Sequence, residues 1–183
     1  SKFKILYLSF KERLPLASLL IGDFRHIFIL VTNKSLQNGG LRLMTFQKTL
    51  RLFNMALIGG VLYIAIELLW RGYTHWTMGV VGGLCFILLG MNYKFFSSNT
   101  PLLFQAIIGT LFVTFVEFIS GIILNLWLGL GIWDYSNLPF NLLGQISLPY
   151  MLLWIPLSLI AIVLYSWLRY WLYNEERPKY KLI

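Results

Sequence analysis

Charged residues are scarce in this chain of 183 residues. Asp, Glu, Lys and Arg make up 12% of it, whereas hydrophobic residues make up 58%. Soluble domains carry about 25% charged residues, so the composition excludes an ordinary water-soluble fold. Together with a mean hydropathy of +0.72, the composition predicts an integral membrane protein.

Several chemical motifs are also missing. Cys85 is the only cysteine, which excludes a disulfide framework and a paired thiol for metal or redox chemistry. The sequence has no Gly-x4-Gly-Lys-Ser/Thr phosphate loop, so any ATP hydrolysis must come from a separate subunit. It also has no His-Glu-x-x-His metal motif. The sequence therefore identifies no cofactor, and whether a metal is bound stays unknown.

Acidic residues are fewer than basic ones, seven against 15, which gives a formal net charge of +8. The Lys and Arg residues flank apolar stretches instead of lining one face of a helix. That distribution is typical of membrane orientation, whereas a nucleic-acid surface needs a continuous basic patch. We therefore expect the lipid bilayer, and no nucleic acid, as a partner.

The apolar residues gather in four long stretches. They cover residues 52–70, 75–92, 101–128 and 147–172. A helix needs about 20 mainly apolar residues to cross a bilayer. The sequence therefore predicts an all-α polytopic membrane protein with four transmembrane helices, arranged as two hairpins.

The basic residues predict how these helices are oriented. Nine Lys and Arg occur up to Arg51, one lies at position 94 and four lie from Arg169 onward. The connections after the first and third spans hold only Arg71. Because cytoplasmic loops carry the excess of Lys and Arg, we expect both termini in the cytoplasm. The connection between the third and fourth spans should lie outside.

We divide the chain into an N-terminal segment, residues 1–50, a transmembrane domain, residues 51–174, and a cytoplasmic tail, residues 175–183. Within the first segment, residues 14–31 are apolar except for charged or imidazole side chains at their centre, which are Asp23, Arg25 and His26. This interruption favours an interfacial or cytoplasmic helix over a fifth span.

Two glutamates lie deep in the apolar stretches. Glu67 and Glu117 each follow a glycine, Gly59 or Gly109, by eight residues, and the two patterns are 50 residues apart. A charged side chain in hydrocarbon costs about 2.5–3.5 kcal/mol on insertion scales, so both must face protein, water or a ligand. Each should lie ~24 Å along its helix, in the outer half of the membrane. The pattern fits a parallel repeat of two hairpins, although generic apolar similarity remains an alternative.

Other polar residues should lie near these carboxylates. Arg71 follows Glu67 by four residues, which places the two charges on one helical face. His75 would share this face if the helix continued through Gly72. The seven candidate site residues come from the first three spans and the connections after the first and third: Glu67, Arg71, His75, Glu117, Asn125, Asp134 and Tyr135.

This cluster has several interpretations. It could be a structural set of ion pairs, because such pairs also bury charge. It could bind or translocate a small polar or cationic solute, since polar groups in membranes usually line pathways. It could also be a metal-dependent enzyme site, in which Glu67, Glu117, Asp134 and His75 act as metal ligands or as acid and base. A membrane interaction or regulatory subunit is a further alternative.

Glycines in the first two spans predict close helix packing instead of ligand contact. They are Gly59, Gly60, Gly79, Gly82 and Gly83.

The residues resemble the bacterial CmpB-like family, called "putative ABC-transporter type IV". The resemblance covers about residues 52–180, and its most specific part is Trp-Asp-Tyr-Ser, beginning at Trp133, with Pro-Phe-Asn, beginning at Pro139. It also rests on single residues of the first three spans and their connections: Glu67, Trp70, Arg71, Gly72, His75, Trp76, Gly82, Gly83, Pro101, Glu117 and Gly144. The resemblance implies a multi-pass permease of the bacterial cell membrane, working with a separate ATPase subunit. Because four short spans make a poor closed pathway alone, we also expect a homo- or hetero-oligomer.

Overall fold

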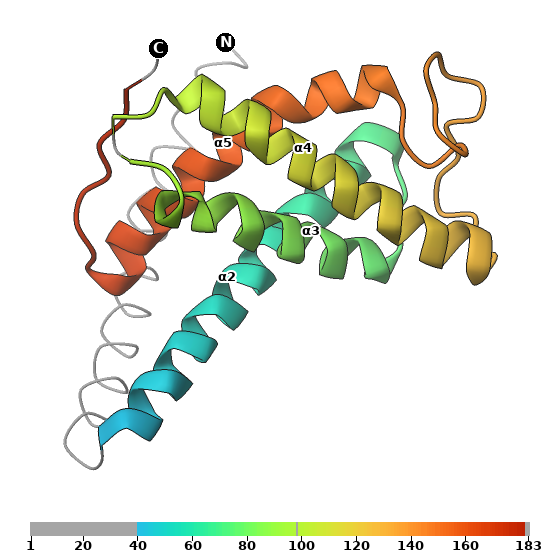
Figure 1. Ribbon diagram of the computed structural model, residues 1–183. Coiled ribbons are helices and arrows are strands. Elements are labelled where there is room, and N and C mark those ends of the chain that lie inside the picture. Colours follow the sequence, from blue (N-terminus) through green and yellow to red (C-terminus); the bar gives the residue numbers. More distant parts are fainter. Residues whose placement is uncertain (1–39, 98, 182–183) are drawn as a thin grey trace, which may run out of the picture.

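The computed structural model describes residues 40–97 and 99–181, and these residues form helices without a strand (Figure 1). The elements in chain order are α2 (Gly40–Arg71), α3 (Trp76–Gly90), the 3₁₀ helix η1 (Met91–Lys94), α4 (Leu102–Gly121), the π-helix η2 (Ile122–Trp127) and α5 (Leu148–Tyr173). The interfacial helix predicted within the first 39 residues lies outside the described residues.

Within the described residues, four stretches are long and apolar enough to cross a membrane. They are Phe46–Arg71, Trp76–Lys94, Leu102–Trp127 and Leu148–Tyr173. These spans confirm the prediction of an all-α protein with four transmembrane helices. Helix α2 begins at Gly40, so it runs without a break past the predicted start of the first span at residue 52.

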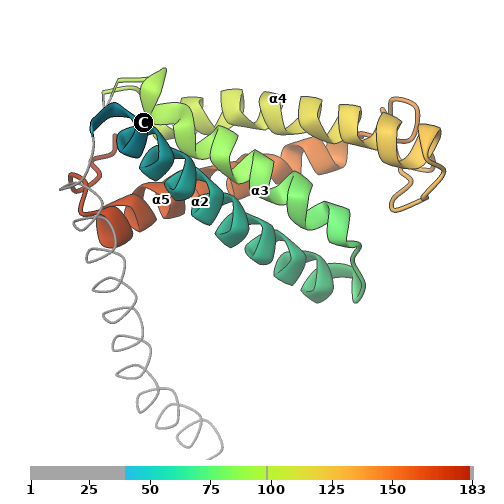
Figure 2. The same cartoon turned by 90° about the horizontal axis from the view of Figure 1, so that it is seen from below.

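The four helices form two antiparallel hairpins, α2 with α3 and α4 with α5 (Figure 2). We call the end that carries residues 128–147 the loop end, and the end that carries residues 174–181 the tail end. The hairpins lie close together at the tail end and diverge toward the loop end (Figure 2). Both α2 and α4 run from the tail end to the loop end, as the predicted parallel repeat requires. The repeat itself stays a prediction.

Glycines bring α2 and α3 together, as the sequence predicts. A Cβ atom at Gly60 would lie 2.4 Å from the carbonyl oxygen of Gly79, and one at Gly83 would lie 2.4 Å from that of Ala56. A side chain at either glycine would therefore force the two backbones apart. Without Cβ atoms there, the helices gain close van der Waals packing, which drives helix association in lipid.

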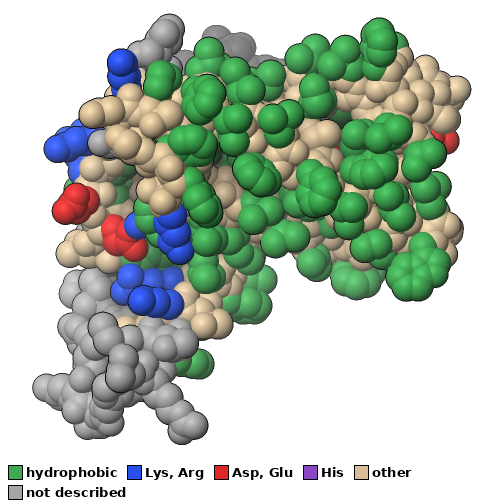
Figure 3. Space-filling model, viewed as in Figure 1, with side chains coloured by type: hydrophobic (Ala, Val, Ile, Leu, Met, Phe, Trp, Pro, Cys, Tyr) green, Lys and Arg blue, Asp and Glu red, His purple; other side chains and the backbone are tan. Residues whose placement is uncertain are grey.

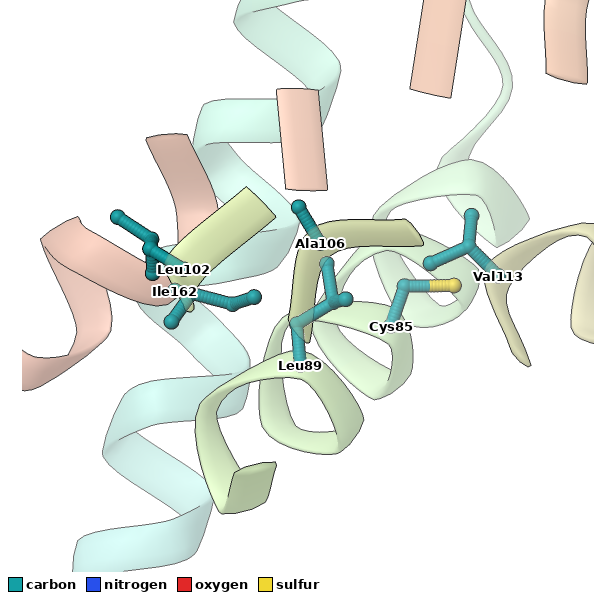
Figure 4. Packing of buried hydrophobic residues seen from close by; sticks show 6 residues of the cluster. All are labelled: Cys85, Leu89, Leu102, Ala106, Val113 and Ile162. Carbon is teal, nitrogen blue, oxygen red and sulfur yellow. The ribbon is translucent and has the colours of Figure 1, made fainter. Parts of the chain in front are cut away.

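The largest core cluster lies where α3, α4 and α5 meet (Figure 4). Its members are Cys85 and Leu89 from α3, Leu102, Ala106 and Val113 from α4, and Ile162 from α5. Next to it, the buried hydroxyl of Thr110 donates a hydrogen bond of 3.2 Å to Ser158, which links α4 to α5. The single cysteine is thus a packing residue.

Residues 174–181 close the tail end. The backbone N–H of Leu102 donates to the carbonyl of Lys181 at 2.7 Å, and Glu175 forms ion pairs with Arg51 and Arg169. Lys and Arg side chains gather at this end on the face seen in Figure 3, while hydrophobic side chains predominate over the rest of that face. This distribution fits the predicted cytoplasmic position of the tail end, which stays a prediction.

Candidate functional site

The first glutamate, Glu67, forms an ion pair at the loop end of α2. The Arg71 guanidinium donates from Nη2 to Glu67 Oε1 at 2.6 Å, which confirms the pair expected from their spacing. The Thr74 hydroxyl donates to the other oxygen, Oε2. Arg71 also donates from Nη1 to the carbonyl of Ile132 at 3.0 Å, and this bond ties the first hairpin to residues 128–147. Glu67 is therefore neutralised within the chain.

His75 was expected beside this pair only if the helix continued through Gly72, and this condition is not met. Helix α2 ends at Arg71, because Gly72 adopts a φ of +76°, in the left-handed region that glycine favours. His75 instead caps the start of α3. Its Nδ1 accepts from the backbone N–H of Thr77 and forms a 2.8 Å hydrogen bond with the Thr77 hydroxyl. The imidazole thus satisfies a helix terminus.

The second glutamate, Glu117 of α4, has a different environment. Tyr135 donates from its hydroxyl to Oε1 at 3.2 Å, and Trp154 of α5 donates from Nε1 to Oε2 at 3.0 Å. Both donors are neutral groups. Glu117 is only 8% exposed, and no Lys, Arg or His of the described part of the chain forms an ion pair with it. Its charge therefore lacks a partner there.

Aromatic rings surround Glu117. Tyr135 stacks on Tyr150 with ring centroids 4.4 Å apart, and Tyr63 stacks on Trp154 at 6.0 Å. Burial raises the pKa of Tyr135, which lies outside the spans, far above its usual range. The hydroxyl therefore keeps its proton and remains a donor to Glu117.

Asn125 organises the chain that follows η2. Its Oδ1 accepts from the backbone N–H of Ile132 at 2.7 Å, while its Nδ2 donates to the Trp133 carbonyl at 3.0 Å and to Gln145 Oε1 at 2.9 Å. Asn125 thereby links the early part of the segment 128–147, at Ile132 and Trp133, to its late part, at Gln145. Since Tyr135 belongs to this segment, Asn125 positions a group that contacts Glu117.

Asp134 is exposed, and its side-chain hydrogen bonds stay within its own turn. Its two oxygens accept from the backbone N–H and the hydroxyl of Ser136. Across residues 40–97 and 99–181, no three His, Cys, Asp or Glu side chains come together as a metal site would require. The four side chains that the sequence suggested as metal ligands therefore each form hydrogen bonds to protein groups at different places in the structure.

A cavity of about 470 Å³ lies between the two hairpins. Its walls are α2 and α5, and α3 and α4 form its floor. The polar lining lies at the loop end, where Glu67, Arg71, Tyr135 and Tyr150 contribute. The remaining lining is mainly apolar and aromatic: Gly59, Leu62, Tyr63, Ile66, Trp70, Gly82, Cys85, Phe86, Leu89, Val113, Leu153, Trp154, Leu157, Ile160, Ala161 and Leu164. Both donors to Glu117 line this cavity.

Three residues of this region were missed from sequence: Tyr63, Tyr150 and Trp154. Each carries a polar group inside or at the edge of an apolar span. A buried indole N–H or phenol normally finds a hydrogen-bond partner, so Trp154 in the middle of the last span was a usable signal. Which acceptor it would meet depends on how α4 packs against α5, which the sequence does not specify.

No curated protein and no solved structure matches the chain. The family described as "putative ABC-transporter type IV" matches residues 39–181, which include all four spans and the segment 128–147. The match begins earlier than the resemblance at about residue 52. Its description supports a general role in transport. The chain therefore belongs to the family of ABC-transporter components described as "putative ABC-transporter type IV".

Proposed function

We propose that this chain is a membrane subunit of an ABC transporter that recognises a solute through a cationic group placed beside Glu117. The observation that carries the proposal is that, among the described residues, Glu117 is paired with two neutral donors only, Tyr135 and Trp154. An ionised carboxylate inside a membrane normally faces a partner charge or water. A cationic group on the solute would supply that charge.

The surroundings of Glu117 suit a cation. A carboxylate offers about four lone-pair sites, and two hydrogen bonds occupy only part of this capacity. The neighbouring rings of Tyr63, Tyr135, Tyr150 and Trp154 present π-systems, which attract ammonium groups within about 6 Å of the ring centroid. The solute would thus meet both a negative charge and aromatic faces.

Glu67 has another role in this proposal. Arg71 and Thr74 occupy both of its oxygens, so it shapes the polar end of the cavity without acting as a free charge. Asn125 holds Tyr135 in place through the segment 128–147. Asp134 and His75 lie outside the proposed binding set because their contacts serve a turn and a helix cap.

Other chains would supply the ATP hydrolysis that drives transport and would complete the enclosure of the solute pathway. The sequence has no phosphate loop. Lining residues of the cavity between the hairpins, such as Ile66 and Ile160, are exposed on the surface of the described part of the chain. We propose a separate ATPase subunit and at least one further membrane subunit, either a second copy or a different chain. The loop end would face the cell exterior.

The alternatives have less support. A metal-dependent enzyme would need its donors together, whereas His75 and Asp134 have partners of their own. A regulatory subunit is favoured when the carboxylates are fully paired internally and no cavity opens between the hairpins. Glu67 is fully paired, as a regulatory subunit would require. Glu117 has no countercharge among the described residues, and a cavity lies between the hairpins, so neither of these features favours a regulatory subunit.

Glu117→Gln should abolish recognition of a cation and leave the fold intact, because glutamine retains the shape and one acceptor oxygen. We would measure the thermal unfolding of purified protein in nanodiscs with added tetramethylammonium chloride, using sodium chloride as the salt control. A ligand that binds only the native state raises the unfolding temperature. The wild type should show this rise and Glu117→Gln should not.

Asp134→Asn is the matched control, because it removes one negative charge at the same end of the molecule without touching the cavity. It should respond to tetramethylammonium as the wild type does. An equal response of wild type and Glu117→Gln, or no response of the wild type, contradicts the proposed function.

A further inference from the structure

The cavity between α2 and α5 is long and has a volume of about 470 Å³. Its lining extends along α2 from Gly59 to Arg71 and along α5 from Tyr150 to Leu164. At 1.5 Å per residue these stretches are about 18–21 Å long. One leaflet of a bilayer has a hydrocarbon thickness of about 15 Å, half of the ~30 Å core. The cavity therefore has the length of an acyl chain standing in one leaflet.

This cavity is a groove that opens sideways. Several of its lining side chains are exposed on the protein surface, including Leu62 at 38%, Ile66 at 46% and Ile160 at 58%. They belong to spans, so in a bilayer the surface that they share meets lipid. A molecule dissolved in the leaflet could enter the groove between α2 and α5 without passing through water.

Polarity along the groove changes in one direction. Its charged residues and the paired tyrosines Tyr135 and Tyr150 lie at the loop end, whereas Leu157, Ala161 and Leu164 follow toward the tail end of α5. A wholly polar solute would leave the apolar part empty, and a wholly apolar one would leave Glu117 without a charge partner. The groove thus fits a molecule with one polar end and one apolar chain.

We propose that this groove binds a single-chain cationic amphiphile. Its ammonium head lies against Tyr135 and Trp154, the two groove-lining donors to Glu117, and its apolar chain lies between α2 and α5. This inference rests on the proposed function and adds the substrate class to it. The amphiphile comes from the leaflet at the loop end, which the charge distribution predicts to be the outer one.

The head and the chain contribute differently. Lipid tails are as apolar as leucine side chains, so moving the chain from the leaflet into the groove changes its environment little. Selectivity therefore comes from the head. A cation next to Glu117 and the aromatic rings is stabilised, whereas an anionic head would add a like charge beside a buried carboxylate.

The test measures binding of radiolabelled dodecyltrimethylammonium to the purified full chain in nanodiscs, corrected for uptake by empty nanodiscs. Leu62→Trp fills part of the groove from α2, toward its tail-end side. The neighbouring Val61→Trp places the same indole on α2 outside the groove lining. A second pair on α5, Leu153→Trp in the lining and Leu152→Trp outside it, repeats the comparison if the first pair folds poorly. All four positions are exposed.

The wild type should bind the probe saturably, and unlabelled dodecyltrimethylammonium should displace it whereas dodecyl sulfate should not. Leu62→Trp and Leu153→Trp should lose this binding and keep the thermal response to tetramethylammonium, while Val61→Trp and Leu152→Trp should retain both. Unchanged probe binding in the two lining variants, or no saturable binding by the wild type, overturns the inference. A tetramethylammonium response in Glu117→Gln equal to the wild type would instead overturn the proposed function.

Discussion

Arg71→Ala should lower the free energy of unfolding by about 3–5 kcal/mol, because removing one partner of a buried ion pair leaves the other charge uncompensated. Arg71 donates to Glu67 and to the Ile132 carbonyl, and the side chains of the pair are only 19% and 11% exposed. The substitution therefore removes two contacts and isolates a carboxylate inside the first span. Unfolding by SDS in mixed micelles, followed by tryptophan fluorescence, measures the effect.

The double variant Glu67→Met/Arg71→Met is the control for this prediction. Replacing a whole buried pair with apolar residues of similar volume is often neutral or stabilising, so the double variant should regain most of the loss. Equal destabilisation of Arg71→Ala and the double variant would show that the bond to Ile132 matters more than the isolated charge. It would contradict the account of a neutralised Glu67.

Asn125→Leu should be the second large loss, about 3 kcal/mol, since it removes three hydrogen bonds that contribute about 1 kcal/mol each. The backbone groups of Ile132 and Trp133 and the side chain of Gln145, all three in buried residues, lose their Asn125 partner. The segment 128–147 should then open more often. Limited proteolysis and amide hydrogen exchange of this segment measure the opening.

Asn141→Leu is the matched control within the same segment. Asn141 also makes several hydrogen bonds, to Ser136 and Leu138, but it is exposed, so water can replace its amide. We expect the control to lose less than about 1 kcal/mol. Similar losses in both variants would mean that Asn125 has no special role in holding Tyr135 over Glu117.

The spans could be predicted because the physical requirement is simple. About 20 apolar residues are needed to cross a bilayer. Three of the four predicted stretches lie close to the bounds of the spans, whereas the first span begins at Phe46, before the predicted start at residue 52. The pair of Glu67 and Arg71 was also predictable, because residues four apart share a helical face. Local spacing and composition were sufficient for both.

Contacts between helices could not be predicted in the same way. His75 was placed beside Glu67 only if α2 continued, and the left-handed Gly72 ends that helix before His75. The partners of Glu117 come from the segment 128–147 and from α5, 18 and 37 residues away. Such contacts depend on helix packing, which apolar composition leaves open. The groove has the same origin, since it exists only because the two hairpins diverge.

The two glutamates of the apparent repeat have different chemistry. Glu67 accepts hydrogen bonds from an arginine and a threonine side chain. Glu117 instead accepts hydrogen bonds from a phenol and an indole. If the hairpins arose by duplication, only one copy kept a carboxylate without a countercharge among residues 40–97 and 99–181. The account therefore depends on Glu117 together with the groove that its two donors, Tyr135 and Trp154, line.

The most direct test of this claim locates the bound amphiphile by photolabelling. The probe is an alkyltrimethylammonium with a diazirine at the far end of its chain, and mass spectrometry identifies the labelled residues. We predict labels at Leu157, Ala161 and Leu164 in the wild type, and their loss in Glu117→Gln. Labels spread over lipid-facing residues outside the groove, or an unchanged pattern in Glu117→Gln, would contradict the account.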